Sequence, residues 1–229
     1  TRLQGWLYRK SRSQPDWVRR RLLGMLRKEL GPEFDIARHF SPSYQPWDQR
    51  LCLVPDGDLF AALRRGQAEV VTDHIAEFTE RGIRLRSGAE LPADIIVTAT
   101  GLELVVMGGI VFEVDGEPVD FSQRWSWRGM MCSGVPNMAN TYGYINASWT
   151  LRADLIARFV CRLLNHMDRV GLQQVTPTLR AGEQGMPARP WIEGFSAGYL
   201  QRVMHLLPRQ GDREPWLNPQ DYVRERRTL

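Results

Sequence analysis

The chain has 229 residues, 43% of them hydrophobic, which is enough apolar material for one large or two small globular domains. Its net charge of +4 comes mainly from arginine and suits an anionic cofactor or substrate as well as nucleic acid, so charge alone selects no partner. Three widely spaced cysteines without a C-x-x-C pair indicate neither a disulfide framework nor a zinc site, and no apolar run is long enough for a membrane span, so we expect a cytoplasmic protein.

The first expected element is an amphipathic helix over residues 13–30. Ser13 stands where a helix cap is expected, and apolar side chains then recur at helical spacing until Gly31 ends the segment. Basic residues on this helix favour a solvated face. A nucleic-acid-binding module is kept as an alternative, although interleaved aromatic residues and a recognised motif are missing. The basic residues are Arg19, Arg20, Arg21, Arg27 and Lys28.

Residues 67–100 are rich in strand-forming side chains and in turns. Turns at 81–82 and 87–88 predict a short antiparallel meander, and the apolar run at 95–97 predicts an interior parallel strand that is buried on both faces. Gly101 follows this run and allows close backbone approach. A strand of this kind is typical of nucleotide-binding sheets, but their glycine fingerprint G-x-G-x-x-G occurs nowhere in the sequence.

The second half of the chain predicts a hairpin, a long helix and an irregular extension. Asp115 and Gly116 predict the turn of a hairpin over residues 110–121. Apolar side chains then recur on one face of a helix that begins near residue 151 and ends near Gly171. From residue 172 onward, glycines, prolines and scattered aromatic residues predict an irregular segment that wraps over the body of the protein.

Four stretches together carry a specific resemblance to a known family. They resemble the C-terminal half of class B flavin-dependent monooxygenases, in the Baeyer-Villiger branch and close to the bacterial thioamide-activating enzymes. In that family the FAD fingerprint, the oxygenase signature and the NADP fingerprint all lie upstream of the helix expected at 13–30. The stretches are YQPWDQRLCLVPDGDLFAAL (44–63), DIIVTATGL (94–102), GVPNMANTYGYINASWTLRADLIARFVCRLL (134–164) and FSAGYLQRV (195–203).

The resemblance implies an α/β fold that is a partial version of a flavoprotein with two dinucleotide-binding (Rossmann-like) domains. The N-terminal FAD and NADP fingerprint regions are missing from it. Residues 1–92 correspond to the remainder of the NADP-binding domain, with a helical insert and a β-meander. Residues 93–170 correspond to the C-terminal part of the FAD-binding domain, and residues 171–229 to an irregular C-terminal extension.

The resemblance also implies an enzyme that depends on FAD and NADPH. Such an enzyme inserts one oxygen atom from O2 into a small apolar ketone, sulfide or thioamide through a flavin C4a peroxide. Arg50 corresponds to the active-site arginine of the family, and its permanently charged guanidinium suits an anionic peroxide. A surface ion pair with Asp48 or Asp56 is the alternative that the residues alone suggest. Gln49 replaces the phosphate-binding lysine of many relatives, which leaves the choice between NADPH and NADH open.

The remaining cofactor-binding residues that the resemblance implies are Thr100 and Gly101, and Asn146, Ala147 and Ser148 before the long helix. The unpaired amides and positive dipole end of a helix favour negative charge, and reduced flavin carries such charge at N1 and the C2 carbonyl. Ordinary capping of the helix by the Asn146 or Ser148 side chain is equally consistent with the sequence.

Other residues that often carry chemistry receive a structural interpretation. The spacing of the four histidines predicts no metal site, and without a cysteine pair a disulfide reductase is not indicated. Cys52 is expected to be a small buried hydrophobic residue. Most of five tryptophans are expected to pack in the core or at an interface, with a substrate pocket as the alternative. These are Trp125, Trp127, Trp149, Trp191 and Trp216.

Two features of the sequence predict that an upstream part is missing. The chain begins with Thr1 rather than methionine, and it has none of the glycine fingerprints of the family. We therefore expect the missing N-terminal half to be a partner, and the isolated chain to bind no FAD and to be inactive. A non-catalytic remnant, or a half-enzyme that needs a separately encoded partner, is the alternative to a fragment of an active oxygenase.

Overall fold

The computed structural model describes residues 2–229, apart from the side chains of Arg2 and Gln4. The chain forms two units, each described here by itself. The larger unit contains the chain up to Arg9 together with Trp47–Arg50 and Glu103–Leu229, and the smaller unit contains Lys10–Pro46 and Leu51–Leu102. The boundary between them falls within the first helix, α1 (Arg2–Ser13).

The smaller unit consists of short helices and one small sheet. The expected amphipathic helix is confirmed as α2, which ends at Gly31 with φ +87°, a conformation that glycine adopts without strain. Its start was predicted wrongly, because Ser13 is the last residue of α1 and the N-cap of α2 is Gln14, which makes no side-chain cap. The helices are α2 (Pro15–Leu30), α3 (Ile36–His39), the 3₁₀ turn η1 (Pro55–Gly57) and α4 (Asp58–Arg64).

The predicted antiparallel meander is confirmed. Strands β1 (Ile75–Thr79), β2 (Gly82–Leu85) and β3 (Glu90–Pro92) form a sheet in the order β1-β2-β3, with Ile83 paired to Leu91. The turn after β1 requires Gly82, because a Cβ atom there would lie 2.0 Å from the carbonyl oxygen of Leu91. A glycine therefore lets two strands approach at this position.

The interior strand that was expected at 95–97 does not form. Residues 93–105 form no helix or strand, and the side chains of Ile95 and Val97 are 82% and 83% exposed. A strand needs neighbours for its amide and carbonyl groups, and within residues 2–229 no strand pairs with this segment. The mixed α/β class is confirmed, whereas the Rossmann-like arrangement stays a prediction because the sheets that these residues form are small and antiparallel.

The larger unit combines one long helix with short elements. The predicted hairpin is confirmed as β4 and β5, whose turn residues Asp115 and Gly116 both have positive φ angles, 54° and 82°. The elements of this unit before the long helix are η2 (Val106–Gly109), β4 (Glu113–Val114), β5 (Glu117–Pro118), η3 (Phe121–Gln123), β6 (Ser126–Trp127) and β7 (Met131–Cys132).

The predicted long helix is confirmed as α5 (Trp149–Val170), which ends at Gly171 with φ +68°. Its buried face includes Ile156, which packs with Met130 and Met131 in one core cluster. The apolar face is not buried throughout, because Leu164 is 53% exposed.

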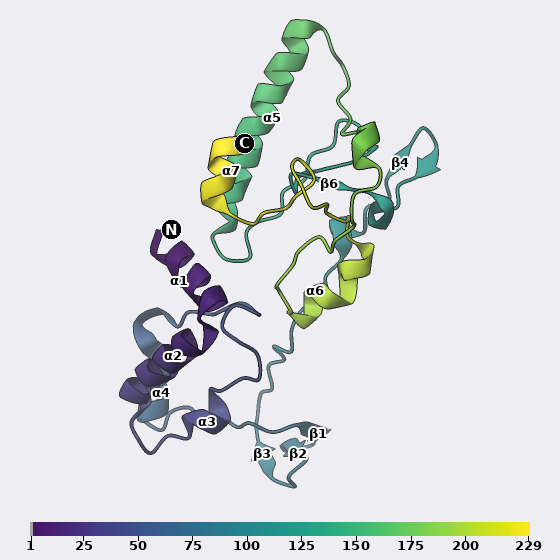
Figure 1. Cartoon of the computed structure of the whole chain (residues 1–229). Coiled ribbons are helices and arrows are strands. Elements are labelled where there is room, and N and C mark those ends of the chain that lie inside the picture. The colour runs from purple at the N-terminus through teal and green to yellow at the C-terminus, as the bar shows by residue number, and fades with distance from the viewer. Residues whose placement is uncertain (1) are drawn as a thin grey trace. The chain divides into compact units, whose positions relative to one another are not determined.

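The segment after residue 172 is more than the expected wrapping extension. It is irregular over much of its length, but it supplies a core cluster formed by Trp191, Phe195, Leu200 and neighbouring residues. Its final helix, α7, packs beside α5, as Figure 1 shows. The elements here are η4 (Ala181–Glu183), α6 (Gly198–Val203), η5 (Met204–Leu206) and α7 (Tyr222–Thr228).

A helix that crosses a bilayer needs about 20 predominantly apolar residues. None of the helices within residues 2–229 combines the length and the apolar character of a membrane-crossing segment.

Candidate functional site

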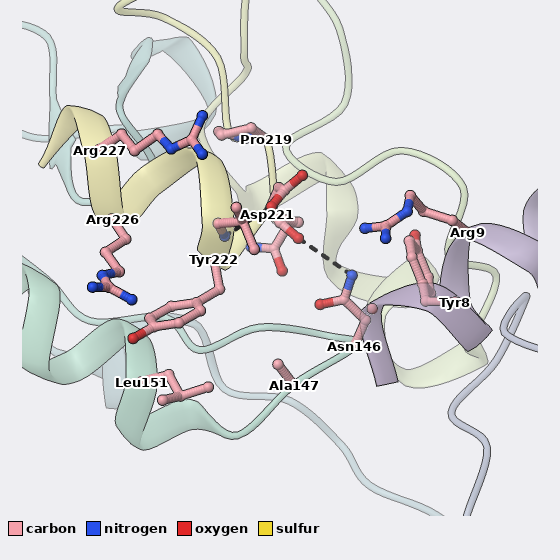
Figure 2. A pocket seen from close by; sticks show the side chains of 13 residues that line it. Tyr8, Arg9, Asn146, Ala147, Leu151, Pro219, Asp221, Tyr222, Arg226 and Arg227 are labelled. Atoms are coloured by element: carbon pink, nitrogen blue, oxygen red, sulfur yellow. Dashed lines mark hydrogen bonds between the residues drawn. The ribbon is translucent and has the colours of Figure 1, made fainter. Parts of the chain in front are cut away.

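A pocket of about 480 Å³ lies within the larger unit, where α7 and the first part of α1 meet the segment that leads into α5 (Figure 2). Asn146 and Ala147 line it, so two of the residues expected to contact flavin border a cavity. The lining residues are Gly5, Tyr8, Arg9, Asn146, Ala147, Leu151, Pro219, Gln220, Asp221, Tyr222, Val223, Arg226 and Arg227.

The charged groups around this pocket are mostly positive. Arg9, Arg226 and Arg227 line it together with one carboxylate, Asp221. That carboxylate is the N-cap of α7 and accepts hydrogen bonds from the amides of Val223 and Arg224, at 2.9 and 3.2 Å. The pocket therefore suits a ligand that is anionic or has an electron-rich edge.

No side chain caps the start of α5. Ser148 is the N-cap residue and makes no side-chain bond to the amides of the helix; instead its hydroxyl lies 2.8 Å from that of Thr150. The Asn146 side chain points to the other wall, where its Nδ2 donates to the carbonyl oxygen of Gln220 at 3.3 Å, the dashed line in Figure 2. Ordinary capping by either side chain is therefore not what these residues do.

The loop 142–148, which carries the expected flavin contacts, is tied down through its backbone. The amide of Ile145 donates to Oε1 of Gln220 at 3.0 Å, and Nε2 of Gln220 donates to the carbonyl of Gly143 at 3.5 Å. Gln220 itself is buried and has a positive φ of 51°, which is uncommon for a residue with a side chain. The side chain of one glutamine thus holds the backbone on both sides of Tyr144.

Arg50 reaches the same loop. Its Nη1 donates to the carbonyl oxygen of Ile145 at 3.1 Å, and the guanidinium remains exposed. The backbone before it is anchored at Asp48, whose carbonyl accepts from the Ser196 amide at 2.6 Å and the Ser196 hydroxyl at 3.1 Å. Arg50 does not line the pocket, but it holds the peptide adjacent to the pocket-lining Asn146.

The other predicted cofactor residues are Gln49, Thr100 and Gly101. Gln49 precedes Arg50 and is half-buried in the larger unit. Thr100 and Gly101 belong to the smaller unit and lie, exposed, at the end of the segment that forms no strand. The structure therefore brings together Arg50, Asn146 and Ala147 within one unit, and Thr100 and Gly101 are not part of that group.

Sequence reasoning missed a buried ion pair beside the pocket. Nη2 of Arg152, on the first turns of α5, lies 2.7 Å from Oε1 of Glu225 on α7, and the two side chains are 0% and 3% exposed. The same Nη2 donates to Oδ1 of Asn218 at 2.8 Å, and the guanidinium lies 5.5 Å from the ring of Tyr144. An arginine four residues after a helix cap looks like any solvated helix residue, so only the fold identifies this one.

Burial governs the protonation of the groups in this cluster. Burial raises the pKa of Glu225 above its ordinary value, and the Arg152 guanidinium opposes that change. Burial, and then the neighbouring Glu225, also raise the pKa of Tyr144. The Tyr144 hydroxyl therefore stays protonated at neutral pH. Nε of Arg152 is buried and has no hydrogen-bond partner within residues 2–229.

Three expectations about other residues can be compared with the structure. Cys52 is exposed, so its assignment as a buried hydrophobic residue was wrong. Trp191 and Trp216 are buried, as expected of packing residues, and no tryptophan is among the residues that line the pocket. Within the described part of the chain, no group of three or more His, Cys, Asp or Glu side chains is placed to hold a metal ion.

The donors and cations around the pocket suit a ligand with a negatively charged edge. A glycine-rich turn before a helix usually holds the pyrophosphate of a dinucleotide, and the sequence contains no G-x-G-x-x-G.

Comparison with known proteins identifies the family. The "FAD-containing monooxygenase EthA" of Mycobacterium tuberculosis is 50% identical over 226 residues, 99% of this chain and 46% of that protein. Its namesake in Mycolicibacterium smegmatis is 48% identical over 222 residues, covering 97% of this chain and 44% of that protein. The "Probable FAD-binding monooxygenase AlmA" of Acinetobacter baylyi is 47% identical over 228 residues, covering 99% and 45%.

The chain thus spans about half the length of the curated relatives that it matches. No family model matches it, and no solved structure is significantly similar. The similarity nevertheless covers 99% of this chain, and that range includes the four stretches that carried the resemblance. Over the part of those proteins that it spans, the chain is a homologue of proteins named as FAD-containing or FAD-binding monooxygenases.

Proposed function

We propose that this chain forms the part of an FAD- and NADPH-dependent monooxygenase that binds one edge of the flavin ring. The complete enzyme transfers one oxygen atom of O2 to a small apolar ketone, sulfide or thioamide. The observation that supports this best is the hydrogen bond from Arg50 to the carbonyl of Ile145, because it puts a permanent positive charge beside the loop that leads into α5.

Bound FAD would supply the redox chemistry and the activation of oxygen. The residues of this chain bind and orient. Asn146, Ala147 and the first amides of α5 would hold the pyrimidine edge of the ring, and their donors favour the negative charge that reduction places there. Leu151 and the ring of Tyr222 supply apolar surface that excludes water from this edge (Figure 2).

Arg50 has a different role in this proposal. Guanidinium groups in proteins are permanent cations, so Arg50 can stabilise an anion formed during oxygen activation. The hydrogen bond to Ile145 uses one donor of Nη1, and a guanidinium can use several donors at once. Gln49, next to it, is uncharged, so we expect discrimination between NADPH and NADH to be weaker than with a lysine there.

The experiment joins or co-expresses this chain with the segment of the M. tuberculosis relative that it does not match. Flavin absorbance measures FAD content, and oxygenated product is measured with a ketone substrate and NADPH. Arg50→Ala should keep stoichiometric FAD and lose product formation by about 100-fold or more, the effect expected when a group that stabilises a developing anion is removed. Arg158→Ala, an exposed arginine of α5, is the matched control and should match the wild type.

Two results would contradict the proposal. Full ketone oxidation by Arg50→Ala would remove the role of the guanidinium. Absence of flavin from the assembled wild-type protein would remove the flavin site altogether.

A half-enzyme that needs a separate polypeptide, or a non-catalytic remnant, is the second candidate. Its motivation is that these 229 residues contain no glycine fingerprint of the kind that holds the pyrophosphate of FAD. In either case the 229-residue chain alone should purify without flavin. A yellow, stoichiometric FAD complex of the isolated chain would exclude this candidate.

A further inference from the structure

The loop 142–148 makes hydrogen bonds with the side chains of Arg50, Gln220 and Arg152, and Arg152 is the most deeply buried of the three. Nη1 of Arg152 donates to the carbonyl oxygen of Tyr142 at 3.4 Å. Its Nη2 donates to Oδ1 of Asn218 at 2.8 Å, and that oxygen also accepts from Nε2 of Gln220 at 3.2 Å. Gln220 in turn accepts from the Ile145 amide. A continuous set of bonds therefore connects Arg152 to Tyr142 at the start of the loop and to Ile145 in its middle.

The guanidinium has no freedom to adopt another position. Its side chain is fully buried, and Glu225 fixes Nη2 from the side of α7 at 2.7 Å. Gly129 packs so closely that a Cβ atom there would lie 2.4 Å from Nη2 of Arg152. The planar fork allows one nitrogen to face the loop while the other faces Asn218 and Glu225, which the single ammonium of a lysine cannot reproduce.

We propose that Arg152, oriented by Glu225, is a positioning residue that holds the loop 142–148 in the geometry needed to contact the flavin edge. This inference rests on the proposed function for its link to flavin. Net stability is a poor explanation for the pair, because apolar residues of similar volume often stabilise a core as well as a buried ion pair does. What the charged pair supplies, and an apolar pair would not, is hydrogen bonds to the loop and to Asn218.

The test uses the 229-residue chain and amide hydrogen exchange read by mass spectrometry. In the double variant Arg152→Met with Glu225→Leu, the core stays apolar and filled. We expect amides of residues 143–148 to exchange about fivefold to tenfold faster, which corresponds to the loss of one or two net hydrogen bonds. Peptides from the core cluster around Trp191 and Leu200 should exchange at the wild-type rate, as should every peptide of the control Arg158→Met.

A second variant separates charge from geometry and covers the case in which the double variant does not fold. Arg152→Lys keeps a cation opposite Glu225 but removes the planar guanidinium with its two Nη donors. Amide hydrogen exchange in the loop 142–148 should therefore again be faster, while exchange in the core stays at the wild-type rate. Unchanged loop exchange in the folded variants would overturn the proposal. Equal acceleration throughout the larger unit, or failure of both variants to fold, would also overturn it, because the pair would then be simply structural.

The proposed link between the loop 142–148 and flavin is tested in the assembled protein described under the proposed function. There the double variant should retain FAD but shift its visible absorption bands, because the donors that face the ring edge are less well fixed. If FAD is retained and the bands do not move, the link from the loop to flavin is wrong. If the wild-type assembly contains no flavin, the proposed function fails, and the exchange result still decides whether Arg152 positions the loop.

Discussion

The two units differ in which side chains they leave exposed and which they bury. The larger unit buries a complete charged pair, Arg152 with Glu225, and surrounds it with hydrogen-bond donors and acceptors. The smaller unit does the opposite at Ile95 and Val97, whose aliphatic side chains are 82% and 83% exposed. Exposed apolar runs of this kind mark surfaces that another part of a protein covers. The larger unit has core clusters formed by its own residues, although Ile110 and Val111 are exposed there too. The contrast therefore lies in the buried charged pair rather than in exposed apolar surface alone.

The largest expected contrast is in thiol reactivity. Burial raises the pKa of Cys132, in the larger unit, to about 12, while the nearby Arg124 opposes the change. At pH 8 about one Cys132 thiol in ten thousand is then ionised, and the thiolate is the reactive form. Iodoacetamide should label the exposed Cys52 and Cys161 in the folded protein and leave Cys132 unlabelled until urea unfolds the chain. Mass spectrometry of the peptides measures this.

The same pKa gives a pH dependence with a definite sign. The folded Cys132 keeps its proton up to about pH 12, whereas the unfolded thiol loses its proton near its ordinary value of 9.0. The contribution to the free energy of unfolding is therefore complete below pH 9. It is lost as the pH rises from 9 towards 12, by up to about 1.4 kcal/mol per pH unit. Cys132→Ala should remove this slope, and a slope that persists would show that other groups cause it.

The next effect concerns the buried pair. Glu225→Gln leaves the Arg152 guanidinium buried without a counter-charge, so the free energy of unfolding should fall by about 3–5 kcal/mol. Urea denaturation followed by tryptophan fluorescence measures it. Asp154→Asn breaks the exposed pair with Arg158 on the same helix and should change the free energy by less than about 1 kcal/mol. Equal effects of the two substitutions would remove the contrast between buried and exposed charge.

The smallest effect on stability should come from the exposed segment. Ile95→Asp and Val97→Asp place a charge where the side chain is already in water, so the free energy of unfolding should change by no more than about 0.5 kcal/mol. Self-association of the chain, measured by analytical ultracentrifugation, should decrease. Ile36→Asp is the control in the same unit, because Ile36 is 3% exposed and its substitution should be severely destabilising. Marked destabilisation by Val97→Asp would mean that the segment is packed.

Much of the local structure could be predicted because its causes are local. The α5 helix, the meander and the turn at Asp115 and Gly116 follow from apolar periodicity and from residues that tolerate positive φ. The α7 helix was missed although a signal existed, since Asp221 caps it by accepting from two amides. The start of α2 was misplaced because Ser13 extends α1 instead of capping the helix that follows.

The sequence by itself determined the resemblance to flavin-dependent monooxygenases, through four stretches whose residue order is specific, and it predicted Asn146 and Ala147 as cofactor-binding residues. Only the tertiary structure decided that Arg152 is buried, that Gln220 and Arg50 hold the same loop, and that residues 95–97 lie exposed. The physical reason is the sequence separation over which the different interactions act. Caps, turns and periodicity act over a few residues, whereas the partner of Arg152 lies 73 residues away. Whether a strand is buried depends on neighbours that its own residues do not specify.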